Sequence, residues 1–64
     1  NASYTDCIVI EDSNAGVEAA KAANMKCIGY KNPNSGNQDL SKADLIIKNF
    51  NELSIEILES LFYV

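Results

Sequence analysis

The stretch CIVIEDSNAG, residues Cys7–Gly16, contains the features from which the fold is predicted. Its first four residues are apolar and mostly β-branched, which is typical of a strand covered on both faces, as in a parallel sheet. Two carboxylates, Glu11 and Asp12, follow directly, and the next four residues, SNAG, are types that begin helices and tighten turns. The acidic pair is therefore expected at the carboxyl end of a strand, where open α/β sheets bind their ligands.

The acidic pair has two interpretations. Adjacent carboxylates at a half-buried strand end repel each other and lose hydration, and burial raises their pKa values. A hard divalent cation relieves both costs, and Mg²⁺ prefers oxygen ligands, so Glu11 and Asp12 are candidate metal ligands. Alternatively, Asp12 caps the following helix and Glu11 is solvated, because acidic residues are common near helix N-termini. The residue types alone leave both interpretations open.

Length and composition exclude several classes of protein. A chain of 64 residues is at most one domain, and a domain of this size buries only about 60% of its unfolded surface, so it is expected to depend on further chain. The net charge of −4, with five lysines or arginines and no histidine, argues against a nucleic-acid partner. No apolar run approaches the roughly 20 residues that span a bilayer, and no signal-peptide pattern is present, so no membrane partner is expected.

Two cysteines, Cys7 and Cys27, each open an apolar run and belong to no CxxC or Cys/His cluster. They are expected to be buried, reduced thiols in a cytoplasmic protein, with a disulfide between neighbouring strands as the alternative.

A helix is predicted over about residues 14–23, with Ser13 or Asn14 as its N-cap. Asn24 stands where a helix commonly ends in the left-handed conformation, which Asn tolerates better than other non-glycine residues. A second strand follows at about 26–30. A crossover of strand, helix and strand is right-handed in about 98% of cases, so the two strands are predicted to be parallel.

The segment 31–42 is rich in Asn, Ser, Gly and Pro, which predicts a loop or a pair of turns, with one helical turn at about 39–43. The loop begins beside the acidic pair, so it either lines a site or is a surface connection. A third strand is predicted at about 45–47 and a final helix at about 54–62. The apolar stripe of that helix is expected to pack on the core and consists of Ile57, Leu58, Leu61 and Phe62.

The segment VIEDSNAGVEAAKAANMKCIGY closely resembles the fourth motif of the haloacid dehalogenase superfamily and the segment after it, most nearly in the β-phosphoglucomutase-like and phosphoglycolate-phosphatase-like branch. The family pattern is an apolar strand, E-D-S-x-x-G, an alanine-rich helix and then Gly-Met before the next strand. The matching residues are Glu11, Asp12, Ser13, Gly16, Ala19, Ala20 and Met25. The chain departs at Asn24, where the family usually has Gly. The resemblance extends over about residues 5–62.

The resemblance implies a Rossmann-like, three-layer α/β/α core, of which residues 1–64 are the C-terminal part. The resemblance implies that Glu11 and Asp12 are ligands of Mg²⁺, and it favours this interpretation over helix capping. Ser13 and Asn14 would support these ligands by hydrogen bonds, and Gly16 would let the backbone approach the nucleophile loop. No catalytic residue is expected in this chain, because the family's nucleophilic Asp and acid/base Asp lie on an earlier strand.

The function implied is that of a Mg²⁺-dependent hydrolase or isomerase, a phosphatase or a phosphomutase, which acts on a small phosphorylated metabolite through an aspartyl-phosphate. Its partners within the protein would be the rest of the core and a cap domain, and the 64-residue chain alone is expected to be inactive. A non-catalytic βαβ structural or interaction module is the alternative. A response-regulator-like phosphoacceptor ranks last, because no third strand here ends in Asp.

Overall fold

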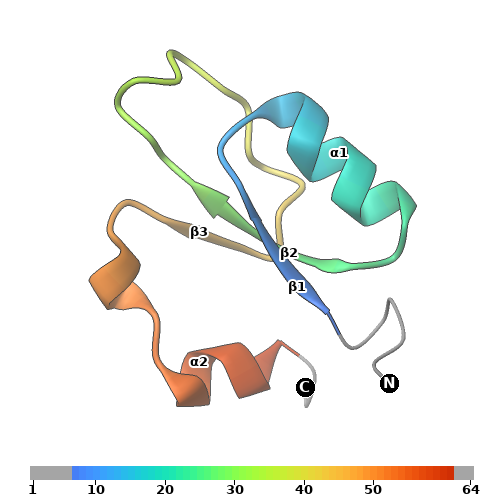
Figure 1. Cartoon of the computed structure of the whole chain (residues 1–64), viewed down its shortest axis with the longest axis vertical. Coiled ribbons are helices and arrows are strands. Elements are labelled where there is room, and N and C mark those ends of the chain that lie inside the picture. The colour runs from blue at the N-terminus through green and yellow to red at the C-terminus, as the bar shows by residue number, and fades with distance from the viewer. Residues whose placement is uncertain (1–6, 62–64) are drawn as a thin grey trace.

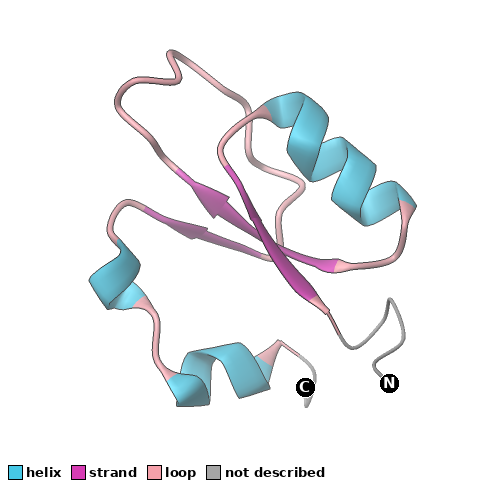
Figure 2. Cartoon of the chain, viewed as in Figure 1, coloured by secondary structure: helices cyan, strands magenta, loops and turns pink. Residues whose placement is uncertain are grey.

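The computed structural model describes residues 7–61 (Figures 1 and 2). The elements in chain order are β1 Ile8–Glu11, α1 Asn14–Ala22, β2 Lys26–Tyr30, β3 Leu45–Ile47, the 3₁₀ helix η2 Phe50–Glu52 and α2 Ile55–Ser60. The strands form one sheet in the order β1-β2-β3, and both neighbouring pairs are parallel. The predicted α/β class and the parallel βαβ unit are confirmed.

β2 and β3 have the predicted bounds, and the bounds of β1, α1 and α2 differ from the prediction by at most two residues. β1 begins and ends one residue later than expected, so Glu11 is its last residue and Asp12 the first residue after it. The segment 39–43 is a turn rather than a helical turn, closed by the Ala43 N–H, which donates to the Leu40 carbonyl at 2.9 Å. Phe62, which was expected in the last helix, lies outside the described residues.

Polar residues define both ends of α1. Ser13 is the N-cap, and its hydroxyl accepts the Gly16 N–H at 3.1 Å. At the other end, Asn24 has a φ of 59°, the left-handed conformation expected from the sequence. The Met25 N–H donates to the Ala20 carbonyl and the Asn24 N–H to the Lys21 carbonyl, both at 3.0 Å. This pair of bonds is the Schellman motif, which satisfies the last helical carbonyls and turns the chain into β2.

The core lies between α1 and one face of the sheet. Val17 and Cys27 are fully buried there, together with Ala20 and Leu40. Gly29 makes room for the turn that precedes β3, because a Cβ on Gly29 would lie 3.0 Å from the Leu40 Cβ. Small residues on α1 and β2 thus allow helix, sheet and turn to pack closely.

The opposite face of the sheet is covered less completely. Ile28 and Ile47 are buried on it, but Ile10 is 46% exposed, so the expectation that β1 is covered on both faces is wrong for this chain. Figure 1 shows α2 on the side of the sheet away from α1. This helix has only six residues, and its first, Ile55, is 74% exposed. The cover on this side is therefore too short to reach the whole of β1.

Cys7 and Cys27 are both thiols, and Cys27 is fully buried, whereas Cys7 is only partly buried. Burial raises the pKa of the Cys27 thiol, and nearby Glu11 and Asp44 add to the rise, so this side chain stays protonated and packs as a small apolar residue. None of the helices within residues 7–61 has the length and apolar character that crossing a membrane requires.

Asp44, just before β3, joins three elements. Its Oδ2 accepts the Cys27 N–H and the Lys21 ammonium, each at 2.8 Å, and its own N–H donates to the Cys27 carbonyl at 2.8 Å. Burial acts to raise the pKa of Asp44, but the hydrogen bonds from Lys21 and from the Cys27 N–H outweigh it and lower the pKa from 3.8. This carboxylate therefore stabilises the folded chain in its ionised form.

We expect Asp44→Ala to reduce the free energy of unfolding by about 2 kcal/mol, because it removes a charged acceptor from a backbone N–H. Glu18→Ala is the matched control: its ion pair with Lys42 joins side chains that are 50% and 65% exposed, so about 0.5 kcal/mol or less is expected. Urea denaturation of the complete protein measures both. Equal effects of the two substitutions would contradict the anchoring role of Asp44.

Candidate functional site

The acidic pair lies at the carboxyl edge of the sheet. Glu11 pairs in register with Gly29, so β1 and β2 end side by side at this edge. The loop that follows β2, residues 31–39, arches from this edge to the beginning of α1, as its green and yellow trace shows (Figure 1). The interpretation that this loop lines a site is therefore the one that its position supports.

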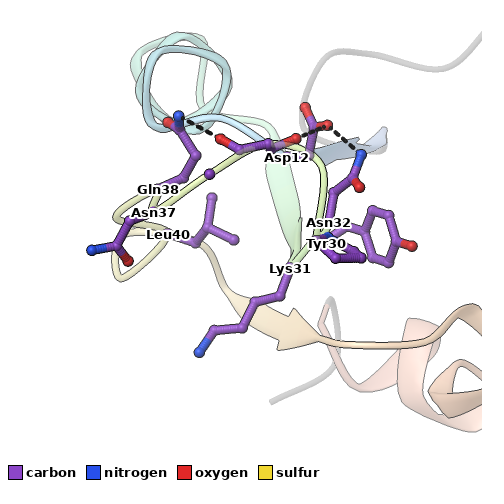
Figure 3. Close-up of a pocket in the computed structure, with 10 residues that line it drawn as sticks. Asp12, Tyr30, Lys31, Asn32, Asn37, Gln38 and Leu40 are labelled. Atoms are coloured by element: carbon purple, nitrogen blue, oxygen red, sulfur yellow. Dashed lines mark hydrogen bonds between the residues drawn. The ribbon is translucent and has the colours of Figure 1, made fainter.

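Asp12 points into the loop. Its Oδ2 accepts hydrogen bonds from the Ser35 hydroxyl at 2.6 Å and from the Asn32 amide at 3.0 Å (Figure 3). The distance to Ser35 is that of a charge-assisted bond to an ionised carboxylate. These two bonds, with Ser35 the larger cause, hold the pKa of Asp12 below its ordinary value of 3.8. Asp12 is therefore ionised at neutral pH.

Asp12 does not cap α1, because Ser13 is the N-cap. The helix-capping alternative for Asp12 is therefore wrong.

Glu11 points toward α1 instead. A Cβ added to Gly16 would lie 2.6 Å from the Glu11 carboxyl carbon and 3.1 Å from its Cγ. The missing side chain at Gly16 thus provides the space in which the Glu11 carboxylate lies against the first turn of α1. Partly buried, Glu11 has different neighbours from Asp12, and whether the two carboxylates bind one ion stays a prediction.

Ser13 and Asn14 connect the site to its surroundings. The Ser13 hydroxyl bonds to α1, as described above. The Asn14 N–H donates to Gln38 Oε1 and its amide donates to the Asp39 carbonyl, both at 2.9 Å. The hydrogen bonds of both residues thus go to α1 and the loop, and their role at a metal or phosphate group stays a prediction.

Sequence reasoning placed the loop but missed the residues in it that contact Asp12. Asn32 and Ser35 carry the polar groups, and Gln38 holds the loop to α1. The position of these residues in the sequence could have indicated them. Residues that follow the second of two parallel strands lie at the same edge of the sheet as residues that follow the first.

A pocket of about 250 Å³ opens between Asp12 and the loop. Six of its lining residues carry polar or charged side chains, and Tyr30, Pro33, Gly36 and Leu40 complete the lining (Figure 3). Residues 7–61 contain no cluster of three or more His, Cys, Asp or Glu side chains that could hold a metal ion. A cation at this edge would therefore find at most two such side chains among the described residues, and water or other segments would complete its shell.

We expect the Asp12 carboxyl group to titrate below 3.8, and its midpoint to rise in Ser35→Ala, because the stronger of its two hydrogen bonds is lost. Because the pKa of Asp12 is lower in the folded state than in the unfolded state, its carboxylate stabilises the fold at pH values above the unfolded-state pKa. This stabilisation is lost as the pH falls through the folded-state pKa. Carboxyl ¹³C NMR during an acid titration measures the midpoint. An unchanged midpoint in Ser35→Ala would contradict the assignment.

Known proteins resemble the chain in sequence. No model of a protein family matches it. β-Phosphoglucomutase from Bacillus subtilis is 36% identical over 56 residues, which are 88% of this chain and 23% of that enzyme. Two Arabidopsis thaliana proteins match shorter segments: a CBBY-like protein at 45% identity over 40 residues, and SUPPRESSOR OF QUENCHING 1, a chloroplastic protein, at 63% over 27 residues. The chain spans 23%, 12% and 3% of the lengths of these relatives.

A solved structure matches the fold. The crystal structure of β-phosphoglucomutase from Clostridium difficile superimposes with a TM-score of 0.77 and 33% sequence identity. The match covers 98% of this chain and 26% of that enzyme. The sequence match and the structural match are β-phosphoglucomutases from two organisms, and the chain is therefore a haloacid dehalogenase-like segment that is homologous to part of β-phosphoglucomutase.

Proposed function

We propose that the protein containing this segment is a Mg²⁺-dependent phosphoryl-transfer enzyme, a phosphatase or a phosphomutase, that acts on a small phosphorylated metabolite. In this proposal the segment supplies the acidic residues of the metal site, Asp12 and Glu11. The observation that carries the proposal is the ionised Asp12 carboxylate, held at the carboxyl edge of a parallel sheet directly after Glu11. The homology to β-phosphoglucomutase supports the reaction class.

The donor atoms present fit Mg²⁺. Metal binding requires a deprotonated ligand, and Asp12 is deprotonated well below neutral pH. The hydrogen bonds that Asp12 accepts from the side chains of Asn32 and Ser35 go to Oδ2, so Oδ1 is the oxygen that a cation would contact. Glu11 is one residue away and would bind the ion directly or through a water molecule. Hard oxygen donors of this kind are what Mg²⁺ selects.

In this proposal, the segment and the rest of the protein contribute different parts of the active site. A bound Mg²⁺ would screen the negative charge of a phosphoryl group. Asp12 and Glu11 would hold the ion at the sheet edge, and the loop after β2 would line one side of the site. The nucleophilic and acid/base aspartates of the aspartyl-phosphate mechanism would come from the remainder of the core, with a cap domain closing over them. We place this enzyme in the cytoplasm, because a thiol such as Cys27 persists in a reducing compartment.

We expect Asp12→Asn in the complete protein to reduce Mg²⁺-dependent turnover by about 100-fold, because a full charge next to the ion is removed. Glu11→Gln is expected to raise the Mg²⁺ concentration needed for half-maximal rate more than it lowers the saturated rate. Both variants should stay folded, since neither creates a cavity in the core. Titration of the rate with Mg²⁺ distinguishes the two effects.

Circular dichroism is the folding control for these variants. Glu18→Gln is the matched control, because it removes one carboxylate from an exposed position on α1 and is expected to leave the Mg²⁺ titration unchanged. Wild-type activity of Asp12→Asn at low Mg²⁺ would overturn the metal assignment.

The 64-residue chain by itself is expected neither to hydrolyse p-nitrophenyl phosphate nor to bind Mg²⁺ tightly. Two carboxylates leave Mg²⁺ largely hydrated, and the nucleophile of the aspartyl-phosphate step is expected in the remainder of the core. A phosphatase assay and isothermal titration calorimetry on the purified chain test this. Measurable turnover would show that the chemistry resides in this segment.

A further inference from the structure

We infer that Asn32 and Ser35, in the loop after β2, are positioning residues that orient the metal-binding carboxylate of Asp12. This inference rests on the proposed function and deepens it. The two residues would not touch the ion. They would act by presenting one oxygen of Asp12 to it, and the evidence lies in the geometry of their hydrogen bonds.

Both donors converge on a single oxygen atom. The Ser35 hydroxyl and the Asn32 amide approach Asp12 Oδ2 from positions 23 and 20 residues further along the chain. Two donors on one oxygen restrict rotation of the carboxylate about its Cβ–Cγ bond. The other oxygen, Oδ1, then has a defined direction, as a carboxylate needs when it contributes one atom to an octahedral ion.

The donors are themselves held in place. The Asn32 side-chain carbonyl accepts the Asn34 N–H at 2.9 Å, which directs the amide nitrogen of Asn32 toward Asp12. The Ser35 N–H donates to the Asn32 main-chain carbonyl at 3.0 Å, so the two residues belong to one tight turn. An orienting group is effective only if its own conformation is restricted, and here the turn supplies that restriction.

The turn is connected to the helix that begins just after Asp12. Gln38 donates from Nε2 to the Ser35 carbonyl at 3.1 Å and accepts the Asn14 N–H on Oε1 at 2.9 Å. Asp12, the turn and the first residue of α1 are thus linked by a continuous set of hydrogen bonds, of which Figure 3 shows the two to Asp12 and the one between Gln38 and Ser35. Partners behind a metal ligand commonly change metal affinity 10- to 100-fold when they are removed, because the ligand loses its orientation.

A purely structural role would give a different result. If Asp12 only fastened the loop to the sheet, loss of Asn32 or Ser35 would loosen the loop and leave the affinity for the ion unchanged. The two roles therefore separate in a direct measurement of Mg²⁺ binding, which does not depend on turnover.

The experiment measures Mg²⁺ alone binding to the complete protein by isothermal titration calorimetry, with the electron paramagnetic resonance spectrum of bound Mn²⁺ as a second readout. Ser35→Ala and Asn32→Ala are each expected to weaken Mg²⁺ binding about 10-fold or more. Ser35→Thr keeps the hydroxyl and is expected to restore wild-type affinity. Asn34→Ala is the matched control: Asn34 lies in the same turn and, within residues 7–61, donates its hydrogen bond from the main chain, so this variant is expected to bind Mg²⁺ as the wild type does.

Unchanged Mg²⁺ affinity in both alanine variants, with reduced thermal stability, would overturn the inference and leave only a loop-fastening role. Equal loss in Ser35→Ala and Ser35→Thr would overturn it as well, because the hydroxyl would then not be the active group. Should Asn32→Ala fail to fold, the comparison of Ser35→Ala with Ser35→Thr decides alone. Failure of the proposed function is recognised separately, by an Asp12→Asn variant that binds Mg²⁺ as tightly as the wild type.

Discussion

The hydrogen bonds of Asp44 are the constraint on which the arrangement of this chain depends. One carboxylate oxygen connects the last turn of α1, through Lys21, to the main chain of β2, and the Asp44 N–H returns to the same strand. These bonds lie at the end of the sheet opposite the acidic pair. They fix where β2 begins relative to α1 and β3, and the register of β1 and β2 then brings both strands to the same edge. The position of Asp12 next to the loop therefore depends on the Asp44 hydrogen bonds at the opposite end of the sheet.

The site is a product of topology. Asp12 and its partners are about twenty residues apart in sequence, and they meet because β1 and β2 are parallel and end together. A right-handed crossover leaves the segments after both strands at one edge, where neither is needed for the core. The core residues on β1 and β2 can therefore be apolar throughout while the polar residues gather beyond the strand ends. Gly16 lies on α1, and because it has no side chain, the Glu11 carboxylate fits against the first turn of this helix.

Local chemistry explains what could be predicted from the sequence. The apolar run of β1, an N-cap at Ser13 or Asn14 and the left-handed Asn24 are each decided within a few residues, and the structure confirms them with Ser13 as the cap. The exposure of Ile10 could not be predicted, because it depends on how far a short, distant helix reaches over the sheet. The hydrogen-bond partners of Asp12 could not be predicted either, because the loop contains several polar side chains that could have bonded to it. The direction of the Glu11 side chain required the position of α1.

The partly covered face of the sheet has a consequence for handling the protein. Ile10, Phe50 and Ile55 expose large apolar side chains, and β1 lies at an edge of the sheet in the described part of the chain. An edge strand with an apolar side chain is a template for pairing between molecules. Purified by itself, this segment would be prone to concentration-dependent self-association, and its yield would be limited by colloidal behaviour as much as by its folding equilibrium.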